Sequence, residues 1–430
     1  MGISRRIFLQ LTVGAAGGSI TRLVRAQPAD EPATRGQRKA KIVIVGGGFA
    51  GAACALSLRH LNPAFEVMLV DPDDRYITCP MSNAALVGLR NFHSITVSRR
   101  GLERAGVIYA RDRVIAIDTQ RRRARLGAGA VLAYDRLVMA PGIRFLWGTP
   151  QGYDEAASLA MPHAWVAGAQ TQILAAQLRE IRDGGVVAIS VPTGPMRCPP
   201  APFERASLIA GFLKANKPRA KVLIFDGNNH FPRQDAFTEA WHSLYPGMIE
   251  WIPMTEDGVV MRVAPTEMTL YTALGKQRVD VANVIPPQAP GLLAPQAGLA
   301  SDHGWCPVKP LSFESQLIED VHVIGDACIA DPMPKSASAA NAQARQCALA
   351  IVASLAGREP PAPRFESVCY SLLEPGSALS IHGRFDVAGG AIRQLQGEEA
   401  RPATPREEVR SAENWYRHIV KVSFAATVTS

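Results

Sequence analysis

Continuous apolar runs of strand length alternate with a helical segment near the start of the chain. Residues 41–45 and 66–70 form two such runs, and residues 52–60 between them have the small, mostly apolar composition of a packed helix. Parallel strands have near-continuous apolar sequences because helices cover both faces of their sheet. The pattern therefore predicts a βαβ unit of an α/β domain.

The turn between the first strand and the helix has the glycine spacing of a dinucleotide-binding unit. In such a turn Gly46 permits a tight bend, Gly48 lets a pyrophosphate approach the backbone, and Gly51 lets helix and strand pack closely. Asp71 ends the second strand, where a carboxylate accepts a hydrogen bond from a ribose hydroxyl. Strand, turn, helix and acid in this order predict a bound dinucleotide.

Two later segments favour FAD over a nicotinamide as that dinucleotide. One strand runs into a turn at Pro141 and Gly142, where flavoproteins with two dinucleotide folds leave the FAD domain. Another strand ends in Gly325 and Asp326, and in that superfamily the Asp lies against the ribityl and pyrophosphate region of FAD. The three motifs occur in the expected order, so FAD is the predicted cofactor.

A second βαβ-like segment occupies the position of a nicotinamide-binding domain. Its strands are predicted at residues 185–191 and 221–226, with a helix at about residues 203–216. The turn at residues 192–200 contains prolines and a cysteine where glycines would be needed to bind a pyrophosphate. Proline removes backbone donors, so we expect the fold to persist here without NAD(P)H.

These patterns predict an α/β protein with two Rossmann-like, glutathione-reductase-like domains and a C-terminal α+β domain. The predicted parts are a signal peptide at 1–26, a linker at 27–40, an FAD-binding domain in two parts at 41–155 and 289–358, a degenerate nicotinamide-type domain at 156–288, and a C-terminal interface domain at 359–430.

Composition and charge indicate a soluble globular protein. The apolar fraction is 47%, and no uninterrupted apolar run reaches the ~18 residues that a membrane-spanning helix requires. The net charge is +8, but residues 1–26 hold four arginines and no acid, so the rest of the chain has a charge of about +4. We therefore expect neither a nucleic-acid partner nor an integral membrane segment.

The first residues predict export by the twin-arginine route. Arg5 and Arg6 precede a short apolar stretch, and a small-residue cleavage site follows at Ala26. A basic amphipathic helix explains this order of features less well. Twin-arginine export carries folded proteins, often with a cofactor already inserted. The predicted location is the periplasm, an oxidising compartment in which disulfides form.

Two of the seven cysteines occupy positions that predict redox chemistry. Cys198 lies in the proline-rich turn and Cys306 shortly before the Gly-Asp strand; in disulfide reductases both segments border the flavin ring. A disulfide there would react with sulfide, which attacks one sulfur, forms a persulfide and releases the other sulfur as a thiolate. The freed thiolate would then pass two electrons to the flavin. A passive bridge worth roughly 4 to 5 kcal/mol is the structural alternative.

From about residue 40 the sequence resembles the flavoprotein subunit of flavocytochrome c sulfide dehydrogenase. The segments that carry the resemblance are Tyr-Ile-Thr-Cys-Pro-Met-Ser-Asn at 76–83, Met-Pro-His-Ala-Trp at 161–165, Arg-Cys-Pro-Pro-Ala-Pro-Phe-Glu-Arg-Ala at 197–206, Gly-Trp-Cys-Pro at 304–307, and Gly-Asp-Ala-Cys-Ile-Ala-Asp-Pro-Met-Pro-Lys-Ser at 325–336. Cysteine context at three separate sites makes it specific.

The resemblance implies roles for individual residues. It implies that Cys79 is bonded covalently to FAD, that Cys198 and Cys306 form the redox-active disulfide, and that Lys335 belongs to a cofactor-binding segment. It also implies a place near the sulfide site for Glu204, as a catalytic proton acceptor. A glutamate on a solvent-facing helix is the alternative for Glu204.

The resemblance further implies that electrons leave one at a time to a c-type cytochrome subunit. This chain contains no Cys-x-x-Cys-His, so we expect no haem on it. Its histidines show no metal-ligand spacing, and no metal site is expected. The alternative functions are a sulfide:quinone reductase, an NADH-type flavin dehydrogenase and a non-catalytic flavin-binding assembly subunit.

Overall fold

A computed structural model describes residues 39–395 and 404–428 of the chain. The predicted twin-arginine signal and most of the predicted linker lie outside the described residues. The described residues form one compact unit.

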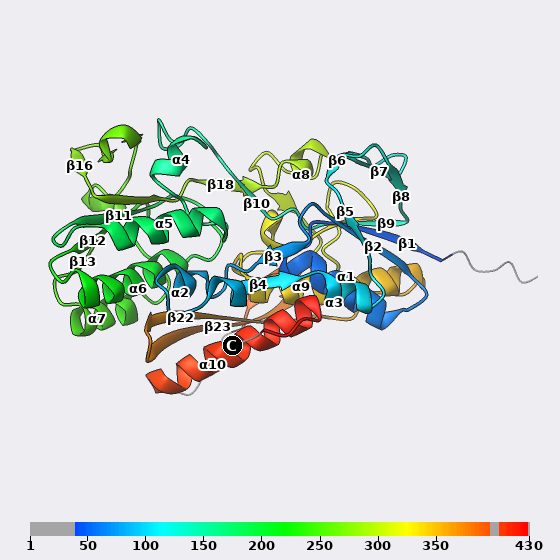
Figure 1. The fold of residues 1–430 in the computed structure, drawn as a ribbon. Coiled ribbons are helices and arrows are strands. Elements are labelled where there is room, and N and C mark those ends of the chain that lie inside the picture. The colour runs from blue at the N-terminus through cyan, green and yellow to red at the C-terminus, as the bar shows by residue number, and fades with distance from the viewer. Residues whose placement is uncertain (1–38, 396–403, 429–430) are drawn as a thin grey trace, which may run out of the picture. The chain divides into compact units, whose positions relative to one another are not determined.

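The first dinucleotide unit builds a five-stranded parallel sheet in the order β20-β9-β1-β2-β5 (Figure 1). Its core strand β1 is covered on both faces, and Ile42 and Ile44 are fully buried. Helices α1 and α9 pack against each other beside this sheet. The bounds are β1 Lys41–Val45, α1 Phe49–Leu61, β2 Glu66–Asp71, β5 Ile108–Arg111, β9 Arg136–Met139, β20 Val321–Val323 and α9 Ala337–Leu355.

The second unit builds a four-stranded parallel sheet in the order β13-β12-β11-β17. Together with the first sheet it confirms the predicted α/β class with two Rossmann-like sheets. Helix α6 packs on β11, β12 and β13. The bounds are α5 Ala169–Glu180, β11 Val186–Val191, α6 Ala201–Asn216, β12 Lys221–Asp226, α7 Gln234–Leu244, β13 Ile249–Ile252 and β17 Val281–Val284.

The C-terminal region is a three-stranded antiparallel sheet with one long helix, in agreement with the predicted α+β character. Strand β22 packs against α6 and α9, while α10 contacts β23 and reaches α1; Figure 1 shows α10, in red, along β22 and β23. This region therefore contacts helices of both Rossmann-like units. The bounds are β22 Arg364–Glu374, β23 Ser377–Ala388, β24 Ala391–Gln394 and α10 Pro405–Phe424.

Shorter elements connect these parts. The antiparallel pair β10 and β18 spans the passage between the two Rossmann-like units. The short strands are β3 Arg75–Ile77, β4 Thr96–Ser98, β6 Val114–Asp118, β7 Arg123–Leu126, β8 Val131–Ala133, β10 Ile143–Phe145, β14 Arg262–Ala264, β15 Thr269–Tyr271, β16 Lys276–Arg278, β18 Gln288–Pro290, β19 Cys306–Pro307 and β21 Cys328–Ile329. The short helices are α2 Ser82–Leu86, α3 Arg100–Arg104, α4 Ala157–Ala160 and α8 Leu293–Gln296.

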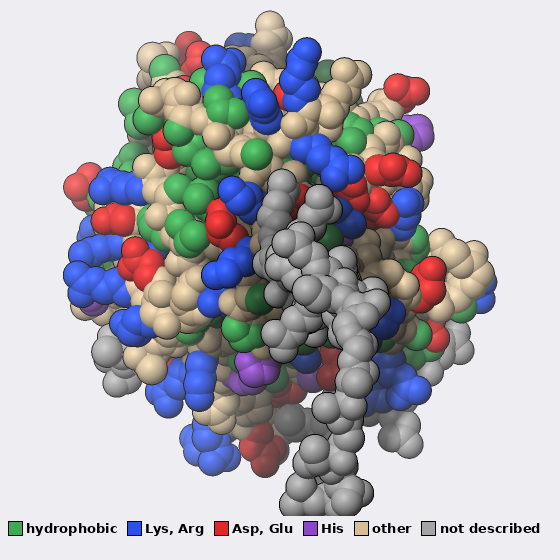
Figure 2. Space-filling view, turned by 90° about the vertical axis from the view of Figure 1, so that its right-hand side faces the viewer, with side chains coloured by type: hydrophobic (Ala, Val, Ile, Leu, Met, Phe, Trp, Pro, Cys, Tyr) green, Lys and Arg blue, Asp and Glu red, His purple; other side chains and the backbone are tan. Residues whose placement is uncertain are grey.

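Basic and acidic side chains are interspersed over the face shown in Figure 2, with apolar side chains between them. Within the described ranges, none of the helices combines the length and apolar character needed to span a membrane.

Candidate active site

One cavity collects most of the residues predicted to act. It is bordered by the turn after β1, the segment after β3, the turn after β11, the segment after β20 and the strand β22. The predicted residues that line it are Gly46, Gly48, Asp71, Cys79, Pro141, Gly142, Cys198, Glu204, Gly325 and Asp326. Two distant parts of the sequence, the dinucleotide turn and the proline-rich turn, thus meet at one site.

The turn after β1 has the backbone geometry that a pyrophosphate needs. A Cβ on Gly46 would lie 2.2 Å from the carbonyl oxygen of Ala140, and one on Gly51 would lie 1.9 Å from the carbonyl oxygen of Gly46. Gly48 is open instead, because a Cβ there would have the Tyr76 hydroxyl, at 3.6 Å, as its nearest neighbour. No side chain caps α1 at Gly48, so the amides of its first turn are available to an anion. These residues fit a dinucleotide.

Asp71 lies at this cavity with its carboxylate already oriented. Oδ2 accepts from the Gly47 backbone N–H at 2.6 Å, and Oδ1 accepts from the Arg99 guanidinium at 2.9 Å. Arg99 is 3% exposed and also donates to the Gly47 carbonyl oxygen. Sequence reasoning missed Arg99, because nothing in its surroundings distinguishes it from a surface arginine.

Cys79 lies in the cavity just after β3, and its segment is held from two sides. Its Sγ is 3.8 Å from the Trp165 carbonyl oxygen. The neighbouring Thr78 hydroxyl is 2.9 Å from the Tyr416 hydroxyl on α10. Both Thr78 and Tyr416 are fully buried, so the position of Cys79 depends on the C-terminal helix.

Cys198 lies in the cavity at the turn that replaces a phosphate-binding loop. Its φ of 52° is in the left-handed region, where a residue with a Cβ is strained. Its backbone N–H donates to the Lys335 carbonyl oxygen at 2.8 Å, which fixes the turn against the segment before α9. Burial raises the pKa of the Cys198 thiol well above its usual value, and the nearby Cys369 and Glu204 raise it further.

The structure does not bring Cys306, the predicted partner of Cys198, to this cavity. Cys306 lies on β19 and pairs in register with Cys328 of β21. It is fully buried, and burial raises the pKa of its thiol to about 12. Strand pairing thus places Cys306 in the core of the first unit, and it is not among the residues that line the cavity.

Cys369 on β22 lines the cavity together with Cys198 and Cys79, and sequence reasoning gave it no role. Burial raises the pKa of its thiol, with a further contribution from Glu204, while a hydrogen bond with Ser336 lowers it. In the structure the alternate residues Phe365, Ser367 and Ser371 of β22 are buried, and Cys369 lies on the same face. The sequence carries no such signal, because Val368, Tyr370 and Leu372 make the opposite face the more apolar one.

Glu204 faces the cavity from α6 and does not have the solvent-facing position of the alternative interpretation. Its carboxylate accepts from Asn83 Nδ2 at 2.7 Å and from the Leu372 backbone N–H at 3.0 Å. Burial raises the pKa of Glu204. The two hydrogen bonds lower it in part, and so does the nearby positive charge of Arg205. A carboxylate with a raised pKa beside two thiols is suited to proton transfer.

Lys335 acts on the backbone of its neighbours. Its Nζ donates to the carbonyl oxygens of Asp326 at 3.0 Å and Cys328 at 2.8 Å and lies 3.9 Å from the centroid of the Trp305 ring. Burial raises the pKa of Asp326, while Arg197 and Lys335 lower it. Lys335 therefore orders the segment that carries Asp326.

Family models match three stretches of the chain. Residues 40–158 match a pyridine nucleotide-disulphide oxidoreductase model. Residues 171–286 match the central part of the sulfide dehydrogenase (flavocytochrome c) flavoprotein chain, and residues 361–424 match the flavin-binding part of flavocytochrome c sulphide dehydrogenase.

Similar proteins agree with these matches. The sulfide dehydrogenase (flavocytochrome c) flavoprotein chain of Chlorobaculum thiosulfatiphilum is 52% identical over 44 residues, which is 10% of this chain and 92% of that sequence. The mitochondrial sulfide:quinone oxidoreductase of Dictyostelium discoideum is 22% identical over 311 residues, covering 71% of this chain and 68% of that protein. The solved sulfide:quinone oxidoreductase of Aquifex aeolicus shares the fold, with a TM-score of 0.70 at 17% identity over 90% of this chain and 93% of the other.

The cavity thus joins a dinucleotide turn to cysteines from two further parts of the fold, and both parts match models of one flavoprotein. The chain belongs to the family of flavocytochrome c sulfide dehydrogenase flavoprotein chains, which are flavin-binding oxidoreductases.

Proposed function

We propose that this chain oxidises sulfide at a disulfide between Cys198 and Cys369 and passes the electrons through FAD to a separate c-type cytochrome. The observation that carries the proposal is the shared cavity: Cys79, Cys198 and Cys369 line it together with the dinucleotide turn at Gly46. The disulfide of the proposal would join the turn after β11, which carries Cys198, to β22, which carries Cys369.

The opening of the disulfide by hydrosulfide needs no further reactant. Hydrosulfide attacks one sulfur of the Cys198–Cys369 disulfide, forms a new S–S bond to it and releases the other sulfur as a thiolate. Two electrons of the substrate sulfur thereby reside in the released thiolate. Glu204, held beside both cysteines by Asn83, accepts the proton of the resulting persulfide.

FAD, when bound, supplies an acceptor that takes two electrons and returns them singly. The residues that would hold it are the turn at Gly46 and Gly48, with Asp71 at the ribose end and Asp326 at the ribityl region. Cys79 is the proposed covalent attachment, which is supported by its place in the same cavity.

Export and partner complete the proposal. The arginine pair at Arg5 and Arg6 supports twin-arginine export to the periplasm, after folding around the cofactor. A one-electron haem acceptor on another chain suits a flavin that releases electrons one at a time. A stable complex with it would bury about 1,200 to 2,000 Å² in total.

The decisive experiment separates this function from that of a sulfide:quinone reductase. Purified protein is mixed with sodium sulfide, flavin bleaching is followed by stopped flow, and either a periplasmic c-type cytochrome or a short-chain quinone is then offered. We expect fast reduction of the cytochrome. Rapid reduction of quinone with none of the cytochrome would refute the proposed partner, and no bleaching by sulfide would refute the function.

The attachment of FAD has its own test. Protein denatured in acid and filtered should keep its flavin colour, and Cys79→Ser should release the flavin into the filtrate. Colour that washes out of the wild-type protein would exclude the covalent bond.

A further inference from the structure

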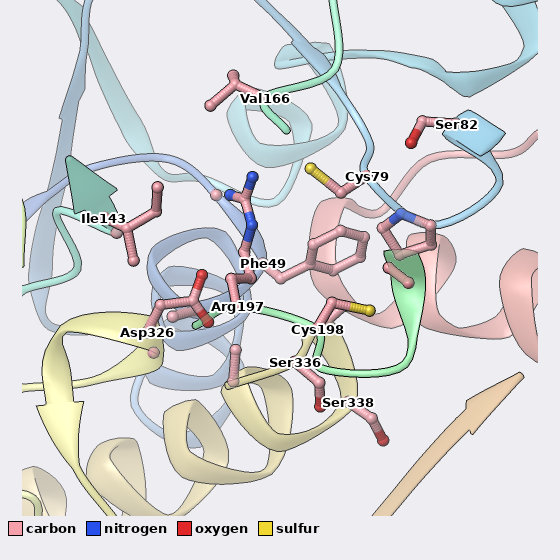
Figure 3. A pocket seen from close by; sticks show the side chains of 18 of the residues that line it. Phe49, Cys79, Ser82, Ile143, Val166, Arg197, Cys198, Asp326, Ser336 and Ser338 are labelled. Carbon is pink, nitrogen blue, oxygen red and sulfur yellow. The ribbon is translucent and has the colours of Figure 1, made fainter. Parts of the chain in front are cut away.

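The cavity holds a guanidinium that has no part in the chemistry described so far. Arg197 immediately precedes Cys198 on the proline-rich turn and lines the cavity. Figure 3 shows its side chain extending into the cavity between Cys79 and Asp326. Cys79 is the proposed attachment of the flavin, and Asp326 is assigned to the ribityl region. The guanidinium therefore lies in the part of the cavity that the proposed function gives to FAD.

Backbone hydrogen bonds hold this arginine in place without help from its guanidinium. The backbone N–H of Arg197 donates to Gln288 Oε1 at 2.9 Å, and Gln288 is 6% exposed. The next backbone N–H, that of Cys198, donates to the Lys335 carbonyl oxygen at 2.8 Å. The turn is thus fixed to β18 on one side and to the segment before α9 on the other.

The hydrogen-bonding capacity of the Arg197 side chain is largely unused. Within residues 39–395 and 404–428 its guanidinium makes one hydrogen bond, which it donates to the Trp165 carbonyl oxygen. Arginine has five donor hydrogens, so several remain for a ligand in the cavity.

Arg205, which also lines the cavity, differs in this respect. It donates to Asn83 Oδ1 at 2.9 Å, to Asn283 Oδ1 at 2.8 Å and to two backbone carbonyl oxygens. These protein acceptors fill its guanidinium, so Arg205 supports the cavity wall. Of these two arginines, Arg197 is the one with donors left for a cofactor.

Arg197 shares its part of the cavity with an acid and a second cation. The acid is Asp326, whose pKa is raised by burial and lowered by Arg197 and Lys335. Lys335 Nζ donates to the carbonyl oxygen of Asp326 at 3.0 Å. Two cations beside one carboxylate leave a net positive charge, which favours a bound group that gains negative charge.

We propose that Arg197 binds FAD through its unused donors and that its charge stabilises the reduced form of the flavin, which raises the reduction potential. This inference rests on the proposed function for the place of FAD and deepens it by naming a residue that sets how readily FAD accepts electrons.

The electron balance shows why a cation matters at this place. Reduction by two electrons and one proton leaves the flavin with one negative charge. The electrons come from the persulfide and the released thiolate, which join in a new S–S bond, and the proton comes from Glu204. The turn after β11 thus carries both Cys198, a thiol of the sulfur step, and the cation that favours the electron acceptor.

The first test measures the midpoint potential of the holoprotein by anaerobic titration with dithionite and a reference dye, without sulfide. Arg197→Met and Arg197→Gln remove the charge, and Arg197→Lys keeps it. Loss of a charge-assisted hydrogen bond changes the equilibrium between oxidised and reduced flavin roughly tenfold to hundredfold, which lowers a two-electron potential by about 30 to 60 mV. We expect this shift in both neutral variants, a smaller one in Arg197→Lys, and the wild-type potential in the control Arg219→Met, whose side chain is 77% exposed.

The second test separates charge from a general loosening of the site. In a Cys79→Ser background FAD can dissociate, so the dissociation constants of oxidised and reduced FAD are measured by anaerobic equilibrium dialysis. Potential and affinity are linked in one thermodynamic cycle. Arg197→Met should therefore raise the dissociation constant of reduced FAD roughly tenfold to hundredfold more than that of oxidised FAD. A loosened site would raise both equally.

The two proposals fail on different results. A wild-type potential in both neutral variants, or equal rises of the two dissociation constants, would overturn the role of Arg197. Failure of sulfide to bleach the wild-type flavin would refute the proposed function instead. The potentials can still be compared in that case, because dithionite supplies the electrons.

Discussion

The two parallel sheets of this chain share a topology and differ in the turn that follows their central strand. After β1 the chain bends through Gly46, whose φ is +95°, and α1 begins with open amides. After β11 the corresponding turn is rich in proline and carries Cys198 at a φ of 52°. The first turn presents backbone donors to a phosphate, and the second presents a thiol.

The acids that end the second strand of each unit differ in the same way. Asp71 lines the cavity, and its side chain is 14% exposed. Asp226 is fully buried, and its carboxylate accepts from Trp251 Nε1 at 3.0 Å and from the Asn228 backbone N–H at 3.0 Å. Asp71 can therefore reach a ribose, whereas Asp226 stabilises its own unit through buried hydrogen bonds. A Rossmann-like sheet is thus a scaffold, and the side chains at its carboxyl edge decide what it binds.

The largest effect should come from removing the sulfur chemistry of the second turn. Cys198→Ser and Cys369→Ser each leave no disulfide to open, so sulfide-dependent flavin bleaching should fall by more than about 10³-fold. Flavin content should be unchanged in both variants. Cys306→Ser is the matched control, because Cys306 lies in the core. Bleaching lost in Cys306→Ser and kept in Cys369→Ser would restore the pairing predicted from the sequence.

Replacing a glycine by alanine should reduce the free energy of unfolding more in the first turn than in the second. Gly51→Ala places a Cβ 1.9 Å from a backbone oxygen, and we expect a cost of more than about 3 kcal/mol, with weaker flavin retention in a Cys79→Ser background. Gly194→Ala meets no atom within 4 Å at a φ of +86°, so its cost should be about 1 to 2 kcal/mol. Urea unfolding measures both. Equal costs would contradict the distinction between the turns.

The pH dependence of the reaction should report Glu204. The carboxylate is the basic form and burial raises its pKa, so the rate of bleaching should fall as pH drops through a value above the usual glutamate range. Glu204→Gln should lower the rate by about 10²-fold and abolish this limb of the profile. The measurement is stopped flow at fixed hydrosulfide concentration. A profile that Glu204→Gln leaves unaltered would exclude proton transfer by this residue.

The smallest effect is expected from replacing the acids Asp71 and Asp226, which end the second strand of each unit. Asp226→Ala leaves buried donors unpaired and should reduce the free energy of unfolding by about 1 to 3 kcal/mol. Asp71→Ala should instead weaken flavin retention during acid-free gel filtration, measured in a Cys79→Ser background. If Asp226→Ala also releases flavin at unchanged stability, the second unit binds a nucleotide after all.

Local patterns predicted the first unit well. The apolar runs, the glycines at Gly46 and Gly51, and the acid at Asp71 act over short stretches of sequence, and the structure has β1, α1 and β2 there. The proline-rich turn likewise revealed a changed second unit. In both regions the property that mattered was local backbone chemistry.

The partner of Cys198 depended on long-range packing and was not predictable in the same way. Cys306 precedes the Gly-Asp strand, but its pairing with β21 turns it into the core. Cys369 reaches the cavity because β22 packs against α6 and α9 after a proline-rich connection. Arg99 was missed for a similar reason, since only the folded chain brings it to Asp71.

The bond between Thr78 and Tyr416 has a consequence for the order of assembly. The cavity wall runs from Gly46 to Trp415, so its first and last parts are synthesised several hundred residues apart. Contacts this distant in sequence form late and slowly. The glycine turn after β1 therefore emerges from the ribosome long before α10, and the wall that encloses a cofactor closes only when α10 has packed.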